Sequence, residues 1–335
     1  MANQPYSRLQ RSYPVIETTF GVAASAPVNG DCCLITTLTG DCQNPEIVRP
    51  DKTGSFGEIL GIPGRRSATW DATLSAAANG AAGIAPDCDT YLQIAFGKAA
   101  TITAGTSVGY SFGDTCPSAT IYDFNAPGTV TQFAILGAIC QKFSATFGAD
   151  VPMLNFSGEA MWVFDTIQLA DPNTETIAKG GIAALVEPAA PVVNGTPPQG
   201  FSGVITLDGN VYSTLRTATV QVDIAREVQK DGFNVYPVAP GAGTRSISFN
   251  AELYDDDSPA LNSLKTAALS PLYPVKTLMF QIGTAAGNKW TWTAHNVRLV
   301  APTYDKQNSR RTVKFTGKAH DTSIGSGDAL SLVIS

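Results

Sequence analysis

The stretch RSATWDATL at residues 66–74 recurs in altered form as RSISFNAEL at residues 245–253, and the two align without a gap. Apolar residues alternate with polar ones in both, which is the period of a strand with one buried and one solvent-facing side. We therefore expect the alternate side chains of both stretches to point into a core: Ala68, Trp70, Ala72, Leu74, Ile247, Phe249, Ala251 and Leu253.

A second pair of stretches follows in the same order. LNFSGEA at residues 154–160 matches VKFTGKA at residues 313–319. Each contains a glycine inside a strand pattern, where glycine normally weakens a sheet. The two matches predict one strand pair that is present twice, and hence two copies of one β domain. Chance likeness between alternating strands is the competing interpretation.

Length and composition agree with two β domains. The chain has 335 residues, of which 44% are hydrophobic and 15% charged, so it can fill two cores of ordinary size. Gly, Ala, Thr and Ser are abundant and long helix-forming stretches are scarce, which favours β structure with many turns. The low charge indicates that part of the surface is covered by other subunits.

Proline marks the predicted domain boundary. We assign residues 1–175 to a first domain with an N-terminal extension, 176–200 to a stiff Pro-rich connector, and 201–335 to a second domain. In the second domain, strands are expected at 203–207, 215–224, 245–253, 277–282, 290–301, 311–319 and 329–334.

Each predicted domain contains one short helix. In the first, Pro86 and Asp87 open an apolar stripe that Gly97 closes. In the second, Ser258 suits the N-cap and Pro259 the first helical position. The predicted fold is therefore mainly β, with two tandem β-sandwich or part-barrel domains, each flanked by a short α-helix.

Cysteine spacing and hydropathy bear on the redox state of the thiols and on membrane association. The six cysteines all lie between Cys32 and Cys140, without the CxxC spacing of zinc sites, so we expect reduced, buried or half-buried thiols. The chain has no run of 18 apolar residues, and its first residues lack the apolar core of a secretory signal. We expect no membrane binding.

Motifs that suggest chemistry are weak. GTSVG at residues 105–109 fits the GxSxG pattern of hydrolases, but a β pattern follows it instead of a helix. Asp255-Asp256-Asp257 precedes a predicted helix, where negative charge is favoured without calcium. We expect no catalytic residue, no cofactor and no metal site, and hence no enzyme.

Two surfaces are candidates for contacts between subunits. Each domain has a long turn-rich segment, residues 44–64 and 226–243, before the strand that recurs in both domains. If copies of the chain assemble into a ring, matching loops would project from it in the same direction, which suits contacts with a ring stacked on it. The candidate stacking residues are Glu46, Arg49, Asp51, Lys52, Glu58, Arg226, Glu227, Lys230 and Asp231. A basic group, either a subunit interface or a solvated face, comprises Arg310, Arg311, Lys314 and Lys318.

Charge is unevenly distributed. Residues 1–175 have 8 basic and 16 acidic side chains, a net charge of −8, whereas residues 176–335 have 14 basic and 12 acidic ones, a net charge of +2. If copies alternate around a ring, unlike neighbours would meet. Neutral drift of surface charge would give the same sums.

The order of elements between residues 64 and 165 resembles the tail tube proteins of long-tailed bacteriophages. The resemblance rests on the strand ending at Leu74, the helix at 87–96, TITAGTSV at 101–108, SATIY at 118–122, the strand pair around Gly137-Ala138, and PMLNFSG at 152–158. In that family, the region around the Gly-Ala and the later L-x-F-x-G pattern recur. Residues 201–335 are similar to a second tube domain with a shorter helix region.

The resemblance implies a structural virion protein, assembled in the host cytoplasm and located in the tail. Single-domain members form hexameric rings that stack into a hollow tube, so a duplicated chain would form a homotrimer with six barrel modules. The partners would be other copies, other tail proteins, and double-stranded DNA as non-specific cargo in an acidic lumen. The family has no catalytic residues to carry over.

Two other classes of function remain open from the sequence. One is another assembly protein of a phage or secretion device, either a decoration or a tube protein. The other is a carbohydrate-binding β sandwich or an esterase.

Overall fold

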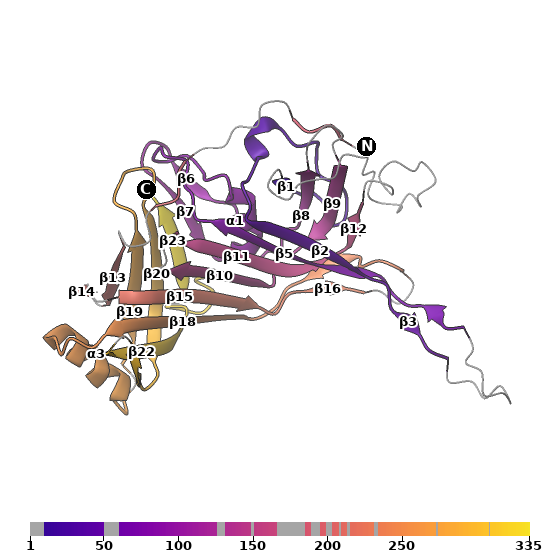
Figure 1. Ribbon diagram of the computed structural model, residues 1–335. Helices are drawn as coiled ribbons and strands as arrows, with labels where there is room; N and C mark the ends of the chain where they lie inside the picture. Colours follow the sequence, from indigo (N-terminus) through magenta and orange to yellow (C-terminus); the bar gives the residue numbers. More distant parts are fainter. Residues whose placement is uncertain are drawn as a thin grey trace.

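The computed structural model describes residues 10–49, 60–125, 131–148, 151–165, 185–188, 195–198, 203–207, 209–212, 215–230, 234–272, 274–307 and 309–335. These residues form a mainly β protein with several antiparallel sheets and two α-helices (Figure 1), as the sequence predicts. We refer to residues 1–175 as the first half and to residues 201–335 as the second half.

The strands of the first half form two facing layers. A four-stranded sheet has the order β1 (Gln10–Ile16), β8 (Ala119–Asn125), β9 (Thr131–Ala138) and β12 (Trp162–Phe164). The layer below it in Figure 1 has the order β2 (Thr37–Gln43), β5 (Ser67–Ser75), β11 (Met153–Ala160) and β10 (Lys142–Phe147).

The second half also has two layers. One has the order β14 (Asn210–Tyr212), β13 (Val204–Leu207), β19 (Lys276–Ile282), β20 (Trp290–Leu299) and β23 (Leu330–Ile334). The other has the order β15 (Leu215–Ile224), β18 (Arg245–Tyr254), β22 (Arg310–Ala319) and β21 (Thr303–Gln307). Here the end of β20 joins the two layers by pairing with β22.

Both predicted strand pairs are present, and their registers agree. Strand β5 pairs with β11 so that Trp70 lies opposite Gly158. Strand β18 pairs with β22 so that Phe249 lies opposite Gly317. The eight side chains that alternation assigned to the core are all buried. A large ring therefore faces a glycine at the same place in each pair.

The strand glycines are required by close backbone approach. A Cβ on Gly158 would overlap the carbonyl oxygen of Ile139, and one on Gly317 would overlap the Phe249 ring and the carbonyl oxygen of Arg298. The Ile139 carbonyl also accepts a hydrogen bond of 3.0 Å from the Trp70 indole, so it has little freedom to move.

We expect Gly158→Ala to lower the free energy of unfolding by about 3 kcal/mol, because overpacking at this carbonyl must displace backbone. Urea denaturation followed by tryptophan fluorescence measures the change. Gly105→Ala is the control, since a Cβ there meets nothing within 4 Å and costs only the strain of a left-handed backbone, about 1 kcal/mol. Equal losses in the two variants would contradict the prediction.

Both predicted helices form, although the first begins at Asp89, two residues later than predicted, without a side-chain cap at Cys88. Helix α1 (Asp89–Phe96) ends at Gly97, whose φ of 72° is left-handed. Helix α3 (Pro259–Leu269) begins after Ser258, whose side chain accepts a hydrogen bond from the Leu261 N–H. Both helices bury an apolar face against the sheets: in α1, the ring of Tyr91 contacts those of Trp70 and Phe156.

The two halves share one sheet and one core. Strand β10 pairs with β15, and β7 (Ser107–Ser111), which also pairs with β6 (Thr101–Thr103), pairs with β23. Aromatic rings meet across the halves: Phe143 lies 5.5 Å from Trp292 between ring centroids, and Phe147 lies 5.8 Å from Phe280. The sequence pattern did not predict this continuity.

The N-terminal segment is fixed by a buried carboxylate. Glu17 accepts hydrogen bonds from the hydroxyls of Ser118 and Thr120 and from the N–H groups of Gly21 and Gly137. Burial raises the pKa of Glu17, and these hydrogen bonds oppose the shift. Four donors around one carboxylate hold the segment after β1 against the four-stranded sheet.

Most of the predicted connector lies outside the described residues; only 185–188 and 195–198 are described. Within that part, Glu187 forms a 2.8 Å ion pair with Arg11 and accepts a hydrogen bond from the Tyr13 hydroxyl. These contacts fasten the connector to β1.

Candidate functional site: a polar sheet with two open edges

The junction of β10 and β15 joins the halves through main-chain hydrogen bonds. On the core side, Phe143 lies opposite Val222 and Phe147 opposite Ala218, and all four are buried. On the other side, Lys142 lies directly opposite Asp223, and opposite charges in this position stabilise antiparallel strands. The junction therefore has an apolar side and a polar side.

The same layer ends in two open edges. Its order is β21-β22-β18-β15-β10-β11-β5-β2, so β2 pairs only with β5, and β21 only with β22, among the described residues. Most side chains of β2 and β21 are exposed. An exposed edge presents unpaired N–H and C=O groups to another strand, so both edges are candidate interfaces.

A polar face runs across the whole layer. Strand alternation places one set of side chains on the core and the other on this face. Six acidic side chains lie on this face against five basic ones: Asp41, Asp71, Glu159, Asp223, Glu252 and Asp305 against Lys142, Arg216, Arg310, Lys314 and Lys318. The face is thus polar and weakly acidic.

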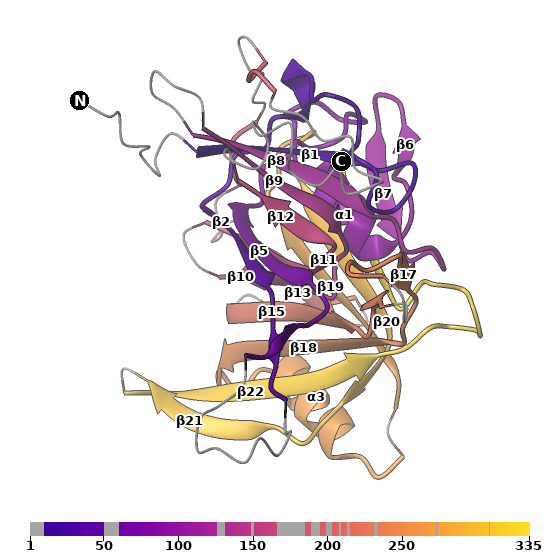
Figure 2. The same ribbon diagram turned by 90° about the vertical axis from the view of Figure 1, so that its right-hand side faces the viewer.

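Two arms leave the layer, the first between β2 and β5 and the second between β15 and β18. The first arm (described residues 44–49 and 60–66) contains β3 (Glu46–Ile47) and β4 (Ile62–Pro63), and the second arm (225–230 and 234–244) contains β16 (Glu227–Gln229) and β17 (Ala239–Gly241). The first arm projects far from the body (Figure 1), toward the viewer in Figure 2.

The second arm packs on the first half of its own chain. Val228 donates its N–H to the Glu159 carboxylate at 2.9 Å, and Lys230 donates to the Ser67 hydroxyl at 3.0 Å. The Arg66 guanidinium lies over the Tyr236 ring, 5.7 Å from its centroid, and donates to its hydroxyl. This arm therefore spans the β10–β15 junction.

The predicted stacking residues that the structure describes differ in exposure. Glu46, Arg49, Glu227 and Lys230 are exposed on the arms, whereas Arg226 is buried, with 4% of its surface accessible. Because its guanidinium binds carbonyl groups inside the protein, this side chain cannot contact a neighbouring ring. Asp51, Lys52, Glu58 and Asp231 lie outside the described residues.

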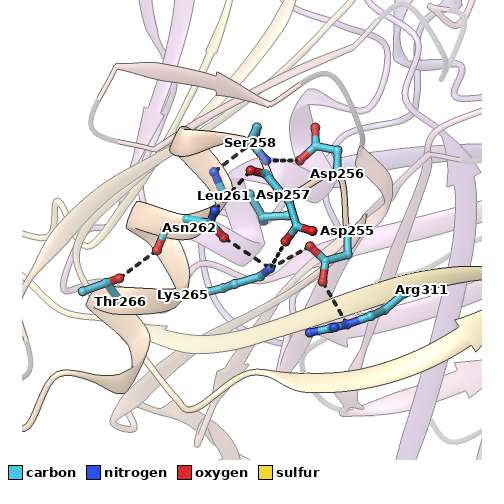
Figure 3. Close-up of polar contacts among 9 residues, drawn as sticks. All are labelled: Asp255, Asp256, Asp257, Ser258, Leu261, Asn262, Lys265, Thr266 and Arg311. Carbon is cyan, nitrogen blue, oxygen red and sulfur yellow. Dashed lines mark hydrogen bonds and ion pairs between the residues drawn. The ribbon is translucent and has the colours of Figure 1, made fainter.

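Part of the predicted basic group is engaged in an ion-pair network with the aspartate run (Figure 3). The buried Asp255 carboxylate lies 2.6 Å from the Lys265 ammonium and 2.9 Å from Nε of Arg311. Burial alone would raise the pKa of Asp255, but the hydrogen bond and charge of Lys265, with the charge of Arg311, hold it below its usual value.

The other residues of the aspartate run and of the basic group have different roles. Asp256 accepts a hydrogen bond from the N–H of Ser258, the N-cap of α3, as the helix-start interpretation predicts. Arg310 lies over the Tyr254 ring and Arg311 over the Tyr304 ring. Lys314 and Lys318 are exposed on the polar face, so they are available to a partner.

The weak chemical motifs acquire no further support. Ser107 begins β7, which continues as a strand through Ser111, so the helix that a nucleophile elbow requires does not follow it. No group of three or more metal-ligating side chains occurs among the described residues. The six cysteines are free; Cys42 is exposed, contrary to the prediction, because it lies on the open edge strand β2.

In comparison with known proteins, no protein-family model matches the chain, and no curated protein matches its sequence. Among the described residues, no helix has both the length and the apolar character to cross a membrane.

Proposed function

We propose that this chain is a structural subunit that joins copies of itself edge to edge into a closed ring, and that its two halves are duplicated modules. The topology supports the duplication. The layers β1-β8-β9-β12 and β2-β5-β11-β10 correspond, strand for strand and in chain order, to β13-β19-β20-β23 and β15-β18-β22-β21.

Shared irregularities support the duplication further. The register shifts between Ala119 and Ile121 where β8 meets β9, and between Lys276 and Leu278 where β19 meets β20. At the same place in the second strand of each pair, Gly137 and Asn296 have left-handed backbones, with φ of 68° and 46°. A β-bulge at the same position in both halves is a specific feature of the fold and not a local defect, so it favours a common origin of the halves.

The β10–β15 junction is the single observation that carries the ring proposal. Under the correspondence, β21 is the counterpart of β10, and β2 is the counterpart of β15. The two open edges therefore have the same relation to each other as the two strands that already pair inside the chain. Such a head-to-tail interface repeats from copy to copy, and it closes into a ring when the rotation between copies divides a full turn.

The internal junction also specifies the register between copies. Transferring the pairs Ala145–Val220 and Phe147–Ala218 to the open edges sets Tyr304 opposite Gly40 of the next copy, and Lys306 opposite Leu38. Tyr304 would face a glycine, as Trp70 and Phe249 do within the chain.

The ring suits the tail tube of a long-tailed bacteriophage, the family that the sequence resembles. Three copies would supply six modules, and closure around an axis would leave neither β2 nor β21 as an open edge. The polar face would line the channel, where its excess of carboxylates would repel the phosphates of double-stranded DNA in transit. Stacked rings would form the tube in the virion, in contact with other tail proteins.

Electron microscopy of the concentrated protein tests this proposal. We expect rings with six similar modules around a hollow axis, with threefold symmetry on averaging, and striated tubes where rings stack. A protein that remains monomeric at every concentration, by sedimentation as well as by imaging, would favour a self-contained β sandwich of the carbohydrate-binding or esterase class. Rings that never stack would favour a decoration protein.

A further inference from the structure

We propose that the first arm of one copy lies across the second half of the adjacent copy in the same ring and clamps the junction between them. This inference rests on the proposed ring. It assigns to the first arm a contact within the ring, in place of the contact between stacked rings that the sequence suggested.

The two arms have the same construction. Ile47 lies opposite Ile62 in the first arm, as Glu227 lies opposite Gly241 in the second. At the base of the arms, a Cβ on Gly64 would meet the carbonyl oxygen of Pro45, and one on Gly243 would meet that of Ala225. Counting from these matched bases makes Val48 the counterpart of Val228.

The two valines differ sharply in exposure. Val228 is 5% exposed because the second arm packs on the neighbouring half of the chain, whereas Val48 is 75% exposed. Ile47, Leu60 and Ile62 of the first arm are also more than half exposed. The second arm packs on the half of the chain that pairs with β15, but among the described residues of one chain no second half pairs with β2, so the first arm has no equivalent surface to cover it. A second copy, paired through its β21, would supply that half.

The surface that receives the first arm follows from the contacts of the second. Glu159 and Ser67 bind the second arm; their counterparts in the second half are Lys318 and Ser246, both exposed. Charge is reversed at the receiving surface, because Lys318 stands where the first half has Glu159. Glu46 on the first arm is exposed, and opposite charges would favour the arm of another copy at Lys318.

Cross-linking between copies tests the clamp. In a Cys42→Ser background, a Val48→Cys chain is mixed with a Lys318→Cys chain, assembled, and treated with a short bismaleimide. We expect a covalent dimer at ten or more times the yield of a matched mixture in which Ser263→Cys, on the exposed side of α3, replaces Lys318→Cys. The Glu46→Lys variant should reduce the yield of rings, and adding Lys318→Glu should restore it.

The outcomes separate the clamp from the ring itself. Cross-links in single rings, isolated by sedimentation before treatment, support the clamp. Rings that form without cross-links above the control overturn the clamp and leave the ring intact. Cross-links found in tubes but not in single rings assign the arm to the next ring and also overturn the clamp. If the wild-type chain forms no rings, both proposals fail.

Discussion

Attaching a large polyethylene glycol maleimide to Cys42 should abolish ring formation and leave the subunit folded. Cys42 is an exposed residue of the open strand β2, and its counterpart at the internal junction is Val222, which is fully buried opposite Phe143. A polymer at this position would occupy the space that β21 of the next copy needs. Sedimentation velocity of the labelled chain measures the loss of rings, and circular dichroism its fold.

The control is the Cys42→Ser chain carried through the same labelling, which should assemble like the wild type. The other five thiols are buried or half-buried, so labelling should reach Cys42 first. Partial burial raises the pKa of Cys42, and mildly alkaline buffer speeds its reaction because the thiolate is the nucleophile. Cys42 should also become protected as rings form. Rings built from fully labelled chains would refute the register proposed for the junction.

Sequence reasoning succeeded where side chains alone determine the structure. Alternation placed Trp70 and Phe249 in the core, and the glycines at 158 and 317 identified the partner strands. Capping residues located both helices, since Ser258 offers an N-cap oxygen and Gly97 accepts the left-handed backbone at the end of α1. These signals act over a few residues, so they can be read from one sequence.

Reasoning failed where backbone pairing determines the structure. Strand β21 has the sequence TYDKQ, without an apolar alternation, and β2 has one buried residue. Edge strands of this kind are held by main-chain hydrogen bonds to one neighbour, so their side chains carry little pattern. The β10–β15 junction is missed for a different reason: both strands alternate, but alternation does not specify which strand pairs with which. However, once the two repeated strand pairs are aligned in the sequence, the number of residues from each pair to its neighbouring strands would match β21 with β10 and β2 with β15.

The buried Arg226 marks a second limit, because exposure depends on tertiary contacts that a loop-like sequence does not disclose. Its guanidinium donates hydrogen bonds to the carbonyl oxygens of Ile94, Cys140 and Thr115, the last two at 3.3 and 3.4 Å. Ile94 belongs to the last turn of α1, where a cation is favoured by the helix dipole. A residue of the second half thereby fixes a helix of the first.

We expect Arg226→Met to lower the free energy of unfolding by about 3 kcal/mol, because it leaves buried carbonyl groups without donors. Arg226→Lys should lose about 2 kcal/mol, since one ammonium group cannot match the planar fork of the guanidinium. Lys230→Met is the matched control on the same arm; it removes only the hydrogen bond of an exposed residue to Ser67 and should cost about 1 kcal/mol. Urea denaturation of the subunit under conditions where rings do not form measures all three. If Arg226→Met were as stable as Lys230→Met, packing of Phe143 and Phe147 against the second half, and not this guanidinium, would hold the two halves together.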